Sequence, residues 1–422
     1  MSSIKFHVTT SYDDFLQAAS GIEITNELIQ QDCIDGIDYQ SYIHPGTFNE
    51  PFLPLKNEHL NYLNELQHGR RIRMARASNI FYLCWQWYSL NEIFFPCIEI
   101  SDEEFLLYCY DSYWLNMMPV FRQSALHTFQ LSTGIGIYKN KIDHPFVMMG
   151  GWGNPSHFFG QYFVRYNVCS LNLELFDGCQ ILGFKLPMWQ KILLNNCYPK
   201  MMAKFEEIDL SEFGPSNGKL LFIQSSRSVF FEDIPQWLGY QHSRAIFRKL
   251  LTSRLTKGLG DSAKLNQNFR NQRIYLSRSF FEQQNNLPAN RRRVMDYIKL
   301  AKLLNKHGFL ILFPDNHHIL FLQELLLYSQ VCVLDPGSSS IHALLAPGQR
   351  RLIQMLDKRD HFLSTSYPSL RNFEWYNAHI GRSLQFCIGK TSYSSGQTSS
   401  LTVGSAFYEE SLLEILKFNS LL

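Results

Sequence analysis

The C-terminal half of the chain alternates regularly between two hydrophobic patterns. Short, continuous apolar runs, typical of buried strands, are each followed by a stretch with apolar residues at helical spacing. Strands are expected at 273–277, 309–313 and 331–334, and helices at 292–305, 319–328 and from 341 onward. A chain that alternates strand and helix in this way forms a doubly wound parallel sheet. This half is therefore predicted to be a Rossmann-like α/β domain.

The N-terminal half has a less regular pattern, in which one strand–turn–helix unit is legible. A strand-like run at 145–150 leads into a turn of Gly, Asn and Pro residues, and a helical stretch follows from 156 to about 168. Further strands are expected at 181–185 and 220–224. A helix dotted with Arg and Lys is expected at 243–254.

The chain of 422 residues exceeds the usual size of a single hydrophobic core. We therefore expect an N-terminal domain over residues 1–240 and a C-terminal domain over 241–390. The remaining segment, 391–422, is expected to hold a mobile loop rich in Ser, Thr and Gly, followed by a closing amphipathic helix at 408–418.

Composition and charge narrow the possible functions. The formal net charge of +2 lacks the basic bias of nucleic-acid-binding proteins. No run of about 18 uncharged apolar residues predicts a transmembrane helix, and the N-terminus lacks the layout of a signal peptide. Nine scattered cysteines without a CxxC pair indicate a reducing compartment, so we expect a cytoplasmic protein. Basic clusters at 68–73 and 291–293 are either solvated faces or sites for phosphate or anionic lipid.

Several familiar motifs are present without the context that their chemistry needs. Residues 214–218 match GxSxG, but a polar stretch precedes them and a strand follows, which is the reverse of a nucleophile elbow. His317 and His318 have no accompanying cluster of metal-ligating residues. The chain contains no Asp-x-Asp pair, which argues against a metal-dependent nucleotide-sugar enzyme with a single sheet.

Three polar features are expected at one edge of the predicted C-terminal sheet. Arg278 follows the first strand, and Arg292 and Arg293 open the next helix. The turn that contains Gly337, Ser338 and Ser339 links the third strand to a helix start, where free backbone N–H groups favour an anion. Together they would suit a diphosphate without a metal ion. The plainer interpretation is that the arginines form surface ion pairs and a serine caps the helix.

The order of short motifs resembles glycosyltransferase family 61. The resemblance covers roughly residues 145–355, and each motif is weak by itself, whereas the order and spacing are fairly specific. The motifs stand at Asn154, His157-Phe158 and Arg165, then at Ile274 to Arg278, Arg292-Arg293, Gly308-Phe309, Pro314-Asp315, Gln323, Gly337 to His342 and Pro347-Gly348. This chain departs from the family pattern at Pro336, directly before the motif glycine, and at Asp296-Tyr297 after the arginine pair.

The resemblance implies a GT-B type α/β fold, with two Rossmann-like domains facing across a cleft. The second domain would bind the nucleotide-sugar donor, and the first would bind the acceptor. The donor-binding residues would be Arg278, Arg292, Arg293, Asp315, Gly337, Ser338, Ser339 and His342, and the acceptor-side residues Asn154 and Arg165. No metal and no permanently bound cofactor are implied.

An inverting transfer in this arrangement needs a base that deprotonates the acceptor hydroxyl. His157 is the first candidate, since an imidazole at a helix start has a suitable pKa. It could equally be a buried histidine that caps its helix. Asp335 is the second candidate, and its alternative roles are to cap the Gly337 turn or to contact the sugar.

The expected function is transfer of a sugar from a nucleotide sugar, first of all a UDP-sugar, to a surface polysaccharide or glycan such as a capsule or lipopolysaccharide. The acceptor would be a glycan or a lipid-linked saccharide, with peripheral contact to the inner face of the membrane. Two alternatives are a non-catalytic nucleotide- or glycan-binding protein of the same fold and a sugar-nucleotide epimerase.

Overall fold

The computed structural model divides the chain into two compact units. Unit 1 comprises Met1–Ile29 and Gly69–Pro235, and unit 2 comprises Gln30–His68 and Gln236–Leu422. The described residues are 4–29, 46–47, 70–86, 92–109, 121–125, 128–131, 137–142, 146–150, 155–208, 220–233, 236–256, 272–277, 293–294, 296–314, 319–335, 341–346, 351–357, 383–391 and 405–422.

The division differs from the sequence-based boundaries in two respects. Unit 2 includes β3 (Gly46–Thr47), which pairs with a strand near the C-terminus and which the sequence-based division placed in the N-terminal domain. The closing helix belongs to unit 2 and is part of its core. The predicted loop lies outside the described residues from 392 to 404.

Unit 2 is built on a parallel sheet in which the strand order reverses once. Five parallel strands lie in the order β16-β14-β17-β18-β19, which is 2-1-3-4-5 in order of sequence. This order is that of a doubly wound fold. The strands are β14 (Arg273–Leu276), β16 (Phe309–Leu312), β17 (Val331–Leu334), β18 (Arg351–Asp357) and β19 (Ser383–Thr391).

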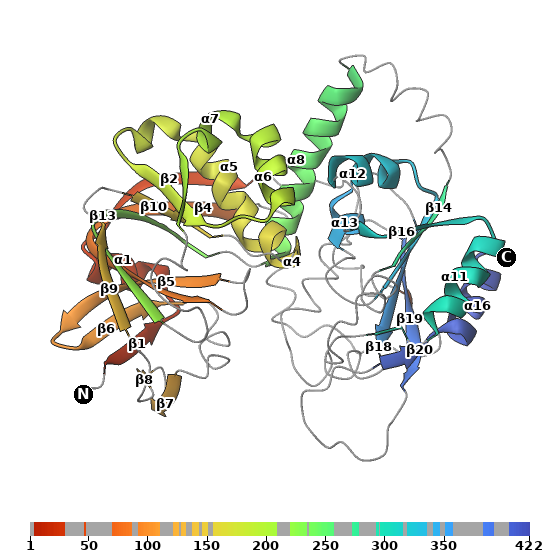
Figure 1. Cartoon of the computed structure of the whole chain (residues 1–422), viewed down its shortest axis with the longest axis horizontal. Helices are drawn as coiled ribbons and strands as arrows, with labels where there is room; N and C mark the ends of the chain where they lie inside the picture. The colour runs from red at the N-terminus through yellow and green to blue at the C-terminus, as the bar shows by residue number, and fades with distance from the viewer. Residues whose placement is uncertain are drawn as a thin grey trace. The chain divides into compact units, whose positions relative to one another are not determined.

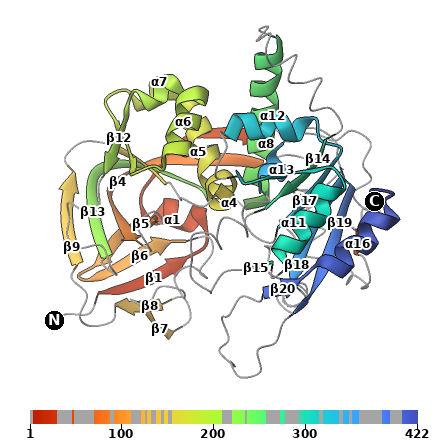
Figure 2. The ribbon, with the colours of Figure 1, turned by 45° about the vertical axis from the view of Figure 1, so that its right-hand side comes forward.

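Helices cover both faces of this sheet because neighbouring strand residues point to opposite sides. Val331 and Val333 pack on the face that holds α11 (Tyr297–Lys306) and α16 (Glu409–Phe418), which lie side by side in Figures 1 and 2. Cys332 and Leu334 pack on the other face. That face holds α12 (Ile319–Leu327) and α13 (Ile341–Leu345), against which α8 (Gln236–Thr256) packs. The continuous apolar strands predicted from the sequence are thus explained by burial on both faces.

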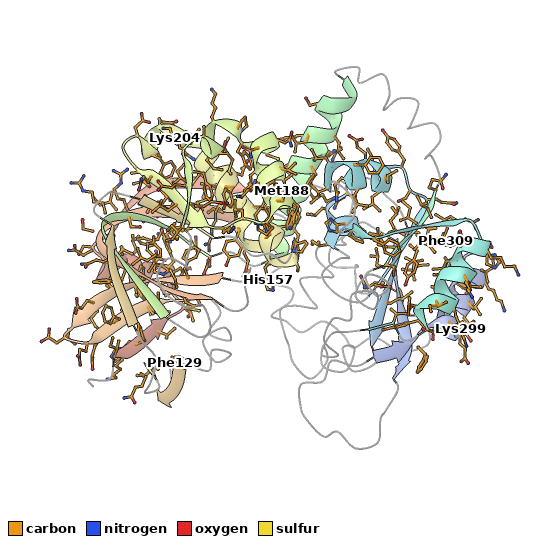
Figure 3. The ribbon with its side chains drawn as sticks, viewed as in Figure 1. Phe129, His157, Met188, Lys204, Lys299 and Phe309 are labelled. Atoms are coloured by element: carbon orange, nitrogen blue, oxygen red, sulfur yellow. The ribbon has the colours of Figure 1, made fainter. Side chains whose placement is uncertain are left out.

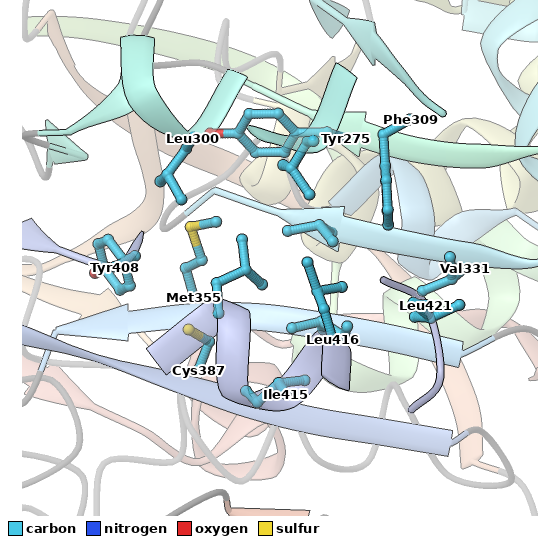
Figure 4. Close-up of a cluster of buried hydrophobic side chains, with 14 of the residues drawn as sticks. Tyr275, Leu300, Phe309, Val331, Met355, Cys387, Tyr408, Ile415, Leu416 and Leu421 are labelled. Atoms are coloured by element: carbon cyan, nitrogen blue, oxygen red, sulfur yellow. The ribbon is translucent and has the colours of Figure 1, made fainter. Parts of the chain in front are cut away.

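Figure 4 shows the larger core cluster of unit 2, on the face of α11 and α16. Leu300 comes from α11, and Ile415 and Leu416 from α16, and all three meet side chains of the parallel strands. Tyr275 of β14 and Met355 of β18 belong to the same cluster, and both are completely buried. The C-terminal helix is therefore a structural element of this unit.

The start of α11 corrects one prediction. The helix was expected from 292, with Arg292 and Arg293 at its N-terminus, but it begins at Tyr297. Arg293 lies in β15 (Arg293–Val294), which pairs with β20 (Ser405–Phe407). The buried Asp296 carboxylate then accepts hydrogen bonds from the backbone N–H groups of Tyr408 and Glu409, at 2.8 to 3.1 Å. Pairing with a segment more than a hundred residues away overrides the local helical pattern.

Unit 1 contains a second parallel region with its own reversal of strand order. The strands β12-β11-β10-β13 run parallel, which is 3-2-1-4 in order of sequence. Their bounds are β10 (Phe146–Met149), β11 (Gln180–Phe184), β12 (Phe205–Ile208) and β13 (Leu220–Phe231). The helical connection after β10 consists of α4 (Pro155–His157), a π-helical turn η1 (Phe158–Tyr162) and α5 (Phe163–Leu171). The strands and the helix predicted here are confirmed, and β13 extends further than expected.

The rest of unit 1 is a mainly antiparallel extension of the same sheet, which the sequence pattern did not predict; β1 with β6 and β9 with β13 are its parallel pairs. Its centre is β4, which pairs with β13 over most of its length. The sheet continues through β5, β6, β1, β8 and β7, with β2 and β9 paired to β4 and β13. These strands are β1 (Lys5–Thr9), β2 (Ile22–Ile29), β4 (Arg70–Gln86), β5 (Glu92–Ser101), β6 (Glu104–Tyr108), β7 (Phe121–Ala125), β8 (Thr128–Leu131) and β9 (Ile137–Ile142).

Alternation of side chains also separates the two faces of unit 1. Met148 packs with Phe15 of α1 (Tyr12–Ala18) on one face. Met149 meets Cys169 of α5 on the other, with the two sulfur atoms 3.7 Å apart. The short helices η2 (Leu173–Phe176), α6 (Met188–Cys197) and α7 (Pro199–Met202) complete the unit.

Both units combine helices with sheet, so the α/β class predicted from the sequence is confirmed. Unit 1 has a large mixed sheet, and unit 2 has a mainly parallel one. None of the helices in the described parts of the chain is both long enough and apolar enough to cross a bilayer.

The packing of α16 can be tested by replacing Leu416 with Ala. This side chain is fully buried in the cluster of Figure 4, so its truncation is expected to lower the free energy of unfolding of unit 2 by about 2–5 kcal/mol. Phe418→Ala, on the same helix but 70% exposed, is the control and should cost less than about 1 kcal/mol. Urea denaturation measures both, and equal losses would contradict the packing described.

Candidate functional site

The strand order of unit 2 places a candidate site at the carboxyl ends of β14 and β17. In open parallel sheets, ligands bind outside the carboxyl ends of the strands at the point where the strand order reverses. Here the reversal lies between β14 and β17, since the chain adds β16 on one side and β17 on the other. The first residues beyond these strands are Ser277 and Asp335, and both are buried.

Asp335 is fixed at this position by hydrogen bonds from two strands. The Tyr275 hydroxyl donates to Oδ1 at 2.6 Å, and the Ser277 hydroxyl donates to Oδ2 at 3.3 Å. The Asp335 backbone N–H donates to the Leu276 carbonyl at 3.2 Å, and its carbonyl accepts from Gln354 Nε2 at 3.0 Å. Asp335 is only 1% exposed, and these partners compensate the cost of burying its polar groups.

The Tyr275 hydroxyl remains a hydrogen-bond donor at any physiological pH. Its burial, and then the negative charge of Asp335, raise the pKa of Tyr275 well above its ordinary value. A protonated phenol and a carboxylate therefore face each other across neighbouring strands. The described contacts hold the two strand ends together, a role that the sequence did not predict for Asp335; its expected roles as base, turn cap or sugar contact stay predictions.

The residues expected to contact a diphosphate follow these strands in the sequence. Arg278 is the next residue after Ser277, and Gly337 is the second after Asp335. Six of the predicted donor residues lie outside the described residues: Arg278, Arg292, Asp315, Gly337, Ser338 and Ser339. For Arg293 only the backbone is described. Their roles remain predictions.

His342, the remaining donor-site candidate, is buried in the helical layer of unit 2. It lies on α13 and is 5% exposed, and its backbone carbonyl accepts from Gln323 Nε2 at 2.9 Å. Nδ1 has no hydrogen-bond partner within the described structure. Burial lowers the pKa of His342 to about 4, so its ring is neutral near pH 7. A neutral ring adds no positive charge for a phosphate.

A pocket of about 450 Å³ opens at the first turns of α11 and α16, on the same carboxyl side of the sheet. Its lining combines the rings of Tyr297 and Phe407 with the acidic side chains of Asp296, Glu409 and Glu410, and with Lys299, whose Nζ lies 3.9 Å from Glu409 Oε2. Carboxylates repel phosphate but accept hydrogen bonds from hydroxyl groups, and aromatic rings stack on apolar faces. The pocket therefore suits an uncharged, hydroxyl-bearing group.

In unit 1, His157 lies after β10, the first strand of the 3-2-1-4 order. It is the last residue of α4, is half-buried, and is labelled in Figure 3. Its Nδ1 lies 3.4 Å from Gln161 Oε1. The π-helical turn η1 begins immediately after it, and such turns occur frequently at functional sites. The helix expected here is present, and His157 lies close to its start.

Gly150 allows this helical turn to pack directly on the end of β10. A Cβ atom at Gly150 would lie 1.8 Å from the Tyr162 ring and 2.7 Å from the Phe94 ring. Only glycine fits such a close approach of ring and backbone. Position 150, between β10 and the segment that leads to His157, is thus restricted to glycine.

Arg165, expected on the acceptor side, forms an ion pair with Asp233 at the end of β13. Its side chain is 12% exposed, and its guanidinium carbon lies 5.4 Å from the ring centroid of Tyr162 and 5.8 Å from that of Phe94. The Asp233 backbone N–H donates to the Tyr108 hydroxyl at 3.0 Å. The partner of Arg165 thus lies in its own unit, and its role toward an acceptor stays a prediction. Asn154 lies outside the described residues.

The sequence pattern missed Asp233 and the contribution of Tyr275. Tyr275 carried a usable signal, because a polar hydroxyl in an otherwise apolar buried strand needs a hydrogen-bond partner. Asp233 carried none, since its partner Arg165 lies 68 residues away. Comparison of the sequence with protein-family models and with curated proteins gave no match.

A double-mutant cycle tests the Tyr275–Asp335 hydrogen bond. Asp335→Ala is expected to lower the free energy of unfolding by about 2–3 kcal/mol, because it leaves the buried Tyr275 hydroxyl without its acceptor. Tyr275→Phe should cost about 1–2 kcal/mol. The double variant should lose at least about 0.5 kcal/mol less than the sum of the two, measured by urea denaturation. Simple additivity would show that the contact contributes nothing.

Acid should weaken the fold through His342. The pKa of its ring is about 4 in the folded chain and near 6.5 when unfolded, so the unfolded chain takes up more protons between these values. This contribution to stability is complete above pH 6.5 and is lost as the pH falls toward 4, up to about 3 kcal/mol. We expect His342→Gln to flatten the pH dependence of the unfolding free energy. An unchanged slope would contradict the buried, neutral state of the ring.

Proposed function

We propose that this protein is a metal-independent, inverting glycosyltransferase that uses a nucleotide sugar. The observation that carries the proposal is the reversal of strand order between β14 and β17. Asp335 is buried there, and the sequence Gly337-Ser338-Ser339 follows it after Pro336. The motif order that resembles glycosyltransferase family 61 supports the same assignment. In this proposal the two units adopt the GT-B arrangement, with the donor on unit 2 and the acceptor on unit 1.

The proposed chemistry depends on neutralising the departing diphosphate. Fixed arginine side chains and free backbone N–H groups stabilise the charge that develops on a leaving group. Asp335 holds the ends of β14 and β17, and thereby positions the loops that follow them. The groups that we assign to the diphosphate are Arg278, Arg292, Arg293, Gly337, Ser338 and Ser339, while Asp315 and His342 complete the donor side.

His157 is the better supported of the two candidate bases. It is half-buried, whereas both carboxylate oxygens of Asp335 already accept hydrogen bonds and the residue is 1% exposed. An imidazole suits proton abstraction from a sugar hydroxyl. Arg165 and Asn154 are the proposed acceptor-side residues, and the Arg165–Asp233 pair sets the conformation of the first.

The proposed substrates are a UDP-sugar and a glycan or lipid-linked saccharide, in the synthesis of a surface polysaccharide such as a capsule or lipopolysaccharide. The pocket at α11 and α16, with its aromatic rings and carboxylates, has a lining compatible with sugar hydroxyls. We place the reaction in the cytoplasm, at the inner face of the membrane.

A thermal-shift screen with UDP-, GDP-, CMP- and dTDP-sugars, followed by a transfer assay, tests the proposal. One of these donors should raise the melting temperature by a few degrees, because a ligand that binds only the folded state stabilises it. His157→Ala should keep this shift but lose about 10²–10⁴-fold in the rate of transfer. His7→Ala, at a partly exposed surface pair in unit 1, is the control.

The outcomes separate the proposal from its rivals. A shift without transfer to any acceptor by the wild-type protein would indicate a binding protein. Turnover of the donor without any acceptor would indicate an epimerase. No shift with any of the four donor classes would contradict the donor site itself.

A further inference from the structure

A second pocket lies in unit 1, at the amino ends of its parallel strands. It has a volume of about 240 Å³. Cys179, the residue before β11, contributes to its lining, as does Ser228, whose register partner is Phe146 at the start of β10. His157 follows the carboxyl end of β10, so the pocket belongs to the opposite edge of the sheet from the proposed acceptor site.

The register of β4 and β13 brings two arginines together in this pocket. In the register of the two strands, Arg76 is paired with Val229, and Ser78 with Arg227. Arg227 is two residues from Val229, so Arg76 and Arg227 lie on the same face of the sheet in diagonal positions. Long side chains in diagonal positions of an antiparallel pair can interact, and like charges repel. Arg76 is oriented by a hydrogen bond from Nη2 to the Leu175 carbonyl at 3.0 Å. The sheet thus holds two positive charges at one small opening.

Three cationic side chains lie close enough to Cys179 to influence the pKa of its thiol. Burial raises the pKa of this thiol, while Arg76, Arg227 and Lys204 each act to lower it. The acidic group that lines the pocket is Asp177, which is 79% exposed at its side chain and pairs with Lys204 at 2.9 Å. Positive charge therefore exceeds negative charge among the residues around the pocket.

The backbone leaves room for a ligand beside these charges. Gly178 lines the pocket with a φ of +80°, and no atom would lie within 4 Å of a Cβ placed on it. A left-handed glycine at this position lets a ligand approach the main chain without meeting a side chain. Paired guanidinium groups match the oxygen atoms of a phosphate in geometry and in charge.

We propose that this pocket binds a phosphate group, carried either by a soluble phosphate ester or by a lipid headgroup. Arg76 and Arg227 contact the phosphate oxygens, and Cys179 lies beside the bound group. The site is independent of the proposed transferase function, since it uses none of the residues assigned there.

Alkylation of Cys179 provides the test, because this thiol lines the pocket and is only partly buried. The rate of reaction with iodoacetamide is followed peptide by peptide by mass spectrometry, and Cys197, also partly buried but outside the pocket, is the internal standard. The probes are inorganic phosphate, glycerol 3-phosphate, and phosphatidylcholine vesicles with and without phosphatidic acid. Millimolar phosphate should slow the reaction of Cys179 several-fold and leave that of Cys197 unchanged.

Three variants with altered charge are expected to change the protection of Cys179 by phosphate in different ways. Arg227→Gln should weaken protection of Cys179 about tenfold in the concentration of phosphate required. Asp177→Asn should strengthen it, because the negative charge at the pocket is removed. Arg71→Gln is the control, an exposed arginine on the same strand as Arg76 that does not line the pocket.

Protection by phosphate and glycerol 3-phosphate would identify a soluble ester as the ligand. Protection only by vesicles that contain phosphatidic acid would identify a lipid headgroup. The proposal is overturned if none of the probes protects Cys179, or if Arg71→Gln changes the protection as much as Arg227→Gln does.

Discussion

The hydrogen bond between the Tyr275 hydroxyl and the Asp335 carboxylate joins the two strands at which the sheet of unit 2 reverses its order. Of the five central parallel strands, β14 comes first in the chain; β16 lies on one side of it, and β17 is the first strand placed on the other. Their carboxyl ends can diverge there, because the helices that follow lie on opposite faces. A buried carboxylate that requires both partner hydroxyls fixes this point, and the loops after the two strands start from a defined geometry.

Asp296 has a related role on the same side of the sheet. Its carboxylate accepts three hydrogen bonds from the first backbone N–H groups of α16, and thereby anchors the C-terminal helix beside α11. Acidic groups at a helix N-terminus are stabilised by its free donors and its dipole. Asp296 and Asp335, both buried in the described part of unit 2, therefore hold neighbouring elements together. Their hydrogen bonds compensate the cost of burying acidic side chains in an apolar core.

The sequence predicted those parts of the fold that depend on local patterns. The strands β14, β16 and β17 and the helix α12 were evident, because burial on both faces makes the strands continuously apolar. The strands of unit 1 before β10 were missed. Some of them form local hairpins, but the pairs β4–β13 and β1–β6 join segments far apart in the chain and leave little trace in a local window. The candidate site residues were likewise predictable only where they depend on the local sequence. His157 and Asp335 could be singled out as residues after strands, whereas the Arg165–Asp233 pair and the start of α11 depend on distant segments.

The pairing of β3 with β19 has a consequence for the order in which this protein can fold. The chain enters unit 2 near residue 30, returns to unit 1, and completes unit 2 only after residue 235. The pairing of Thr47 with Phe386 can therefore form only after the ribosome has added more than three hundred further residues, which takes tens of seconds. Unit 1 can close while part of unit 2 is still unmade. Neither unit is a continuous piece of chain, so cutting the chain at residue 235 would leave residues 30–68 of unit 2 on the fragment that holds unit 1.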